Sequence, residues 1–135
     1  MSALNRINRI GCISHEFGPY KGHGGVASYL REYVNCFIEL QKAGKIPAHI
    51  ELYMIYRHGS DPDEFAGKYP DNIKFIKAPD GMHYSDVVDF FAEQVENNRI
   101  EIVESVDFTG IGIKVALKNC IYKEKPADVF LSVMH

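Results

Sequence analysis

The chain has 135 residues, of which 46% are hydrophobic, so it can bury one ordinary core and a single domain spanning residues 1–135 is predicted. Its 15 basic and 18 acidic side chains give a net charge of -3 with no lysine or arginine run, which argues against nucleic acid as a partner. No window approaches the roughly 20 apolar residues that cross a bilayer, and the start MSALNRINRI lacks the apolar core of a signal peptide, so we expect a cytoplasmic protein.

The first half of the chain predicts a strand, a glycine-rich loop, a helix and a second strand. Ile10 to Ser14 is a mainly apolar run that leads into a loop with several glycines, as a buried strand does. Residues 25–43 place apolar side chains at helical spacing, and Gly44 follows as a stop signal. His49 to Tyr56 alternates apolar and polar residues and predicts a strand, followed by a polar loop to Asn72.

The second half predicts further alternation of strands and helices. Residues 73–76 form a short strand candidate, and Asp86 is expected to cap a helix that runs to about Asn98. Residues 100–104 predict another strand, a helix follows Gly110, and residues 129–133 predict the last strand.

This alternation predicts the α/β class, with a Rossmann-like parallel sheet and helices on both of its faces. Ligands collect at the carboxyl ends of the strands in such sheets. The positions directly after Ser14, Glu104 and Val133 are therefore the ones where function is expected.

The cysteines and histidines give no metal-binding pattern. Cys12, Cys36 and Cys120 form no CxxC pair and are expected to be small buried apolar residues. The six histidines show no HxxxH or HxH spacing, so we expect neither a metal nor another cofactor.

The loop HEFGPYKGHGG at residues 15–25 offers backbone amides to a negatively charged ligand. Glycines allow close approach to the backbone, and the positive end of the following helix favours phosphate or carboxylate. A plain turn is the simpler explanation. Gly22, Gly24 and Ala27 also fit the G-x-G-x-x-A dinucleotide pattern, but seven residues separate Ser14 from Gly22, whereas the fingerprint places its first glycine directly after the strand.

The segment IEIVESVDFTG at residues 100–110 brings two carboxylates, Glu104 and Asp107, to the predicted end of a strand. There they could accept hydrogen bonds from the hydroxyl groups of a sugar. The alternatives are a solvated Glu104 and an Asp107 that caps the next helix.

Taken in order, GPYKGHGGVASYL and IEIVESVDFTGIG resemble the N-terminal domain of the family-four retaining glycosyltransferases, which have the GT-B fold. The resemblance extends from Ile10 to His135. It implies transfer of a sugar from a nucleotide-sugar donor to a carbohydrate or lipid-linked acceptor, with possible peripheral membrane association of the whole protein. It also implies a diphosphate-binding role for Gly24 and Gly25, an acceptor-binding role for Glu104 and Asp107, and a catalytic role for His135. In the glycine loop itself, Tyr20 is expected to bind the acceptor by stacking on a sugar, and His23 is expected to bind it as well.

The sequence also departs from this family. Members that resemble it carry a second, donor-binding domain with an E-x(7)-E motif, so we expect this chain to be an incomplete N-terminal domain that is inactive alone. A non-catalytic anion-binding domain, or a homodimer formed through a sheet edge, remains an alternative. An NAD-dependent oxidoreductase domain is a further alternative.

Overall fold

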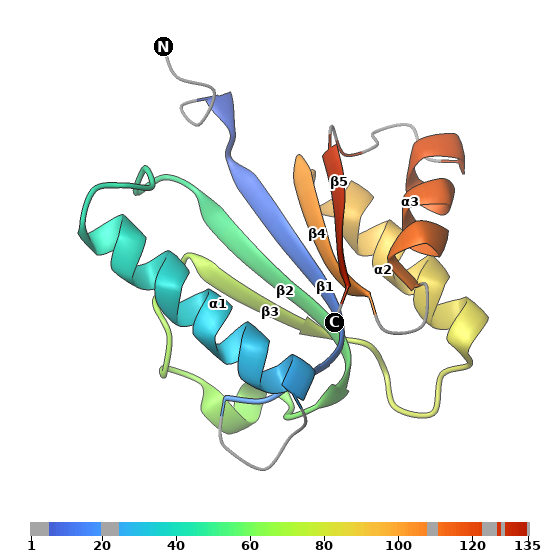
Figure 1. Cartoon of the computed structure of the whole chain (residues 1–135). Helices are drawn as coiled ribbons and strands as arrows, with labels where there is room; N and C mark the ends of the chain where they lie inside the picture. Colours follow the sequence, from blue (N-terminus) through green and yellow to red (C-terminus); the bar gives the residue numbers. More distant parts are fainter. Residues whose placement is uncertain (1–5, 20–24, 108–110, 123–126, 128, 135) are drawn as a thin grey trace.

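The computed structural model describes residues 6–19, 25–107, 111–122, 127 and 129–134. Its strands are β1 (Arg9–Phe17), β2 (Glu51–Gly59), β3 (Ile73–Lys77), β4 (Ile102–Asp107) and β5 (Val129–Met134). Its helices are α1 (Gly25–Lys42), α2 (Tyr84–Asn97) and α3 (Ile111–Tyr122), and a 3-10 turn, η2 (Pro62–Phe65), follows β2. Figure 1 shows these elements in chain order by colour.

The strands form one parallel sheet in the order β3-β2-β1-β4-β5. In Figure 1, α1 lies on one face of the sheet while α2 and α3 lie side by side on the other. The prediction of a Rossmann-like α/β fold with helices on both faces is therefore confirmed. Each strand leads to the next through a crossover connection, because neighbouring parallel strands cannot be joined by a tight hairpin.

Each face of the sheet has its own apolar core because successive side chains of a strand point in opposite directions. On the α1 face, Cys12, Met54 and Tyr56 pack with the helix residues Leu30 and Val34. The opposite core unites strand residues with the buried faces of α2 and α3, and it includes Ile13, Ile55, Val103, Phe91, Val95, Ile111 and Val115.

Helix α1 ends at a glycine, as predicted. Gly44 adopts φ +73°, a left-handed conformation that glycine reaches without steric cost. The Lys45 amide donates to the Leu40 carbonyl at 2.8 Å, and the Gly44 amide donates to the Gln41 carbonyl at 3.0 Å. This pair of bonds is a Schellman motif, which satisfies carbonyls that the helix end would otherwise leave without donors.

Several element boundaries differ from the prediction. Strand β1 continues three residues beyond Ser14, and β4 runs from Ile102 to Asp107 rather than from Ile100 to Glu104. The expected cap at Asp86 is wrong, because α2 already begins at Tyr84 and Asp86 lies in its first turn. A carboxylate in the first turn of a helix interacts favourably with the positive end of the helix dipole, so the sequence pattern indicated the correct region for the helix start.

The burial expected for the cysteines is correct for one residue and wrong for another. Cys12 is fully buried in β1, whereas Cys36 is exposed on α1. Cys36 precedes the buried Phe37, and neighbouring positions on a helix do not share a face. The side chain of Cys120 lies outside the described part of the chain.

No helix among the described residues is both long and apolar enough to cross a membrane.

Candidate functional site

The predicted site lies where the order of the sheet reverses. Strands β1 and β4 are neighbours, with Ile10 opposite Ile102 and Ile13 opposite Ser105. From the carboxyl end of β1 the chain leads to α1 on one face, and from that of β4 it leads to α3 on the other. Divergent connections of this kind leave a crevice at the carboxyl edge in open α/β sheets.

Gly25 is the first residue of α1 and lies at this edge. It is exposed, and a β-carbon built on it would meet no atom within 4 Å. The first turn of α1 contains no acidic residue, so nothing in that turn opposes an anion at the helix start. The predicted partners Tyr20, His23 and Gly24 lie outside the described residues.

Asp107 is the last residue of β4, so its backbone reaches the carboxyl edge as the sequence indicated. Its side chain is not among those described, and His135 lies outside the described residues. Of the predicted site residues, the structure thus places the backbones of Gly25 and Asp107 at one edge of the sheet and the whole of Glu104 within β4.

Glu104 does not end its strand, contrary to the predicted boundary. It pairs with Cys12 of β1 and lies three residues before the end of β4. Its carboxylate accepts a hydrogen bond from the Tyr33 hydroxyl of α1. The second carboxylate oxygen, Oε2, is buried and has no hydrogen-bond partner among the described residues.

This environment shifts the pKa of Glu104. Burial raises the pKa of its carboxyl above 4.5, and the hydrogen bond from Tyr33 opposes that rise. Burial, followed by the charge of Glu104, raises the pKa of the Cys12 thiol. Burial is also the main cause of the raised pKa of the Tyr33 hydroxyl. The thiol and the hydroxyl therefore keep their protons at neutral pH, and Glu104 is the group that can accept a proton or a further hydrogen bond.

Tyr33 is the member of this group that the sequence did not reveal as functional. Its spacing on α1 matches the buried stripe of Leu30 and Val34, so the sequence indicated a packing residue. Tyr33 is only partly buried, and its ring centroid lies 6.2 Å from that of Tyr29. A tyrosine within an apolar stripe is a weak signal of a polar partner beneath the helix.

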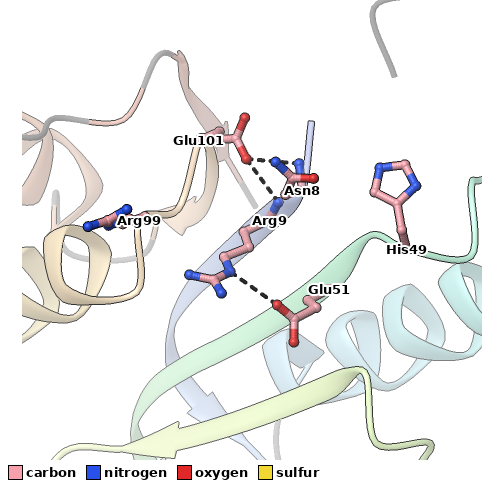
Figure 2. A pocket seen from close by; sticks show the side chains of 6 residues that line it. All are labelled: Asn8, Arg9, His49, Glu51, Arg99 and Glu101. Atoms are coloured by element: carbon pink, nitrogen blue, oxygen red, sulfur yellow. Dashed lines mark hydrogen bonds and ion pairs between the residues drawn. The ribbon is translucent and has the colours of Figure 1, made fainter. Parts of the chain in front are cut away.

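A different cavity lies at the amino ends of the strands, opposite the predicted site. It measures about 540 Å³ and is lined by Asn8, Arg9, His49, Glu51, Arg99 and Glu101. Figure 2 shows that its carboxylates bind groups of the protein itself. Arg9 Nε lies 3.0 Å from Glu51 Oε1, and Glu101 Oε1 accepts the amides of Asn8 at 2.8 Å and Arg9 at 3.2 Å. These contacts join β1 to β2 and to the residue that precedes β4, so we assign this polar cavity to the architecture of the sheet.

Among the described residues, no three His, Cys, Asp or Glu side chains lie together in a way that could hold a metal ion.

No protein-family model matches the chain, and no curated protein matches it significantly in sequence. The fold and the geometry of the site therefore carry the functional argument.

Proposed function

We propose that this chain is the acceptor-side domain of a glycosyltransferase, which acts together with a donor-binding domain to transfer a sugar from a nucleotide-sugar to a carbohydrate or lipid-linked acceptor. The observation that carries the proposal is Glu104, a half-buried carboxylate beside α1 whose Oε2 atom has no partner among the described residues. A buried acceptor atom without a donor is costly, and a ligand hydroxyl would remove that cost.

Each residue would have a simple role in this reaction. The amides at the start of α1, including that of Gly25, would stabilise the negative charge that grows on the departing diphosphate. Glu104 would accept a hydrogen bond from an acceptor hydroxyl, and Tyr33 would hold the carboxylate in place. The roles expected from the sequence for Tyr20, His23, Gly24, Asp107 and His135 stay predictions.

The end of β2 favours this proposal over an NAD-dependent enzyme. A dinucleotide-binding domain commonly places a carboxylate there to bind the ribose hydroxyls. This chain has Arg57 and His58 in that place, and the next acidic residue, Asp61, is engaged by Lys77 at 3.0 Å.

Saturation-transfer NMR on this chain with a panel of mono- and disaccharides tests the proposal. We expect signals from a subset of sugars that disappear in Glu104→Gln, because the amide exchanges an acceptor oxygen for a donor. Glu32→Gln, an exposed substitution on α1, serves as the matched control and should retain the signals. The chain alone should not transfer sugar.

Two outcomes would contradict the proposal. One is the absence of any saturation transfer across the panel while the thermal unfolding midpoint shows a folded chain. The other is saturable NAD(H) binding that Gly24→Asp abolishes, which would favour the oxidoreductase alternative.

A further inference from the structure

Four nitrogen-bearing side chains from separate parts of the sequence gather near the carboxyl edge of the sheet. His15 comes from β1, Arg57 and His58 come from the end of β2, and Lys114 comes from the first turn of α3. The rings of His15 and His58 lie 4.9 Å apart between centroids, at an interplanar angle of 77°. Together with Tyr84, which joins Arg57 to Lys114, these residues are called the basic cluster below.

Tyr84, the first residue of α2, holds the two permanent cations of the basic cluster near each other. The Lys114 ammonium lies 4.6 Å from the centre of the Tyr84 ring, and the Arg57 guanidinium carbon lies 5.9 Å from it. One guanidinium nitrogen of Arg57 also donates to the Met82 carbonyl at 3.2 Å. The aromatic ring attracts both cations, so it offsets part of their mutual repulsion.

The positive charges of Arg57 and Lys114 are not balanced by ion pairs within the described part of the chain. Among the described residues, neither Arg57 nor Lys114 lies within ion-pair distance of a carboxylate. By contrast, Lys118, one turn further along α3, lies 3.0 Å from Asp89. Glu16 is the carboxylate whose charge acts on His15.

The neighbouring positive charges also contribute to the pKa of His15. It is lowered, first by burial and then by the charges of His58 and Arg57, while Glu16 opposes the shift. The starts of α2 and α3 lie at this edge as well, and the positive ends of their dipoles add to the field. Asp86, in the first turn of α2, is the acidic residue that works against this field from that element.

We propose that the basic cluster binds a phosphate group, either as free phosphate or as the phosphomonoester of a small metabolite. A guanidinium, an ammonium and two imidazoles offer donors from several directions, which suits the oxygens of a tetrahedral anion. Tyr84, which contacts both cations of the cluster, packs against the core on the face that α2 and α3 cover, whereas Glu104 interacts with Tyr33 of α1. The proposal therefore does not depend on sugar transfer.

Titration of the chain with inorganic phosphate, followed by NMR of the histidine ring protons, tests this site. Chloride keeps the ionic strength constant, so that general screening does not imitate binding. We expect saturable shifts of the His15 and His58 signals and a higher pKa for His15, because a bound anion favours the charged imidazole. Arg57→Gln and Lys114→Gln should each weaken binding about tenfold, the scale of one charged hydrogen bond.

Lys118→Gln is the matched control, since it removes the same charge from the same helix at a residue already paired with Asp89. It should bind phosphate like the wild type, and unfolding midpoints should show that all variants fold. A hexose 6-phosphate compared with the free hexose and with inorganic phosphate distinguishes the two sources of the anion. Linear, non-saturable shifts, or equal weakening by Lys118→Gln, would overturn the proposal. Neither result would bear on sugar binding at Glu104.

Discussion

The two ends of the sheet carry similar charged side chains in opposite electrostatic situations. At the amino end, Arg9 contacts Glu51 and also donates to the Asn98 carbonyl at 2.7 Å. At the carboxyl end, Arg57 and Lys114 share an aromatic ring and have no carboxylate partner among the described residues. A charged side chain that already forms an ion pair within the protein is less available to a ligand, whereas an unpaired charged side chain stays available. For locating a ligand site, whether charged side chains are already paired within the protein is therefore more informative than whether they line a cavity.

The largest effect is expected at the carboxyl end from Gly59→Ala. Gly59 has φ +122°, and an added β-carbon would clash with the Phe17 carbonyl oxygen, so the ends of β1 and β2 would have to separate. We expect a loss of about 3 kcal/mol or more in the free energy of unfolding, measured with urea.

Gly67→Ala is the control for that substitution. Gly67 also has a positive φ, +83°, but a β-carbon there would meet no atom within 4 Å, so a loss of about 1 kcal/mol is expected. Equal losses for the two variants would show that close contact between β1 and β2 does not limit this end of the sheet.

A smaller loss is expected when the paired network of the amino end is broken. Arg9→Met removes the contacts with Glu51 and Asn98 and should cost about 1–2 kcal/mol of stability, measured by chemical denaturation. Lys114→Met at the carboxyl end should change stability by less than about 0.5 kcal/mol, because that ammonium is exposed and forms no ion pair with the described carboxylates. Similar losses for both variants would remove the distinction between the two ends.

The effect of Glu104→Gln is expected to have the opposite sign. The folded state raises the pKa of Glu104, so it binds a proton more tightly than the unfolded state does. Stability from this group is therefore present below its ordinary pKa of 4.5 and is lost as pH rises through the folded value. The variant should lack this loss and be more stable than the wild type at pH 7. Unfolding curves at pH 4 and pH 7 measure the difference, and a clearly less stable variant at pH 7 would contradict the assignment.

The fold could be predicted because it follows from local patterns. Apolar alternation and helical spacing identified the succession of elements, and the parallel sheet followed from their order. The ends of the strands were harder to predict from the sequence. Strand β4, for example, continues past Glu104 through Ser105 and Val106, which are buried on the sheet. The position of the strand end decides whether Glu104 meets solvent or a helix, so this shift changed the surroundings of a predicted site residue.

The basic cluster could not be predicted from the sequence because no local pattern contains it. Its members lie up to about a hundred residues apart in the sequence, as His15 and Lys114 do, and belong to no common motif. They come together only in the folded chain, where β1, β2, α2 and α3 meet. The identity of Tyr84 as the contact between Arg57 and Lys114 likewise depends on where α2 begins.

The connection between β2 and β3 shows how few residues can cover one corner of a sheet. It contains the four-residue turn η2 in place of a full helix, and aromatic rings fill the space on that side. Phe65 lies 4.8 Å from Phe75 and 6.0 Å from Phe17 between ring centroids. Such rings bury a large area while losing only two side-chain torsions each, so a short crossover can stabilise an edge strand at small entropic cost.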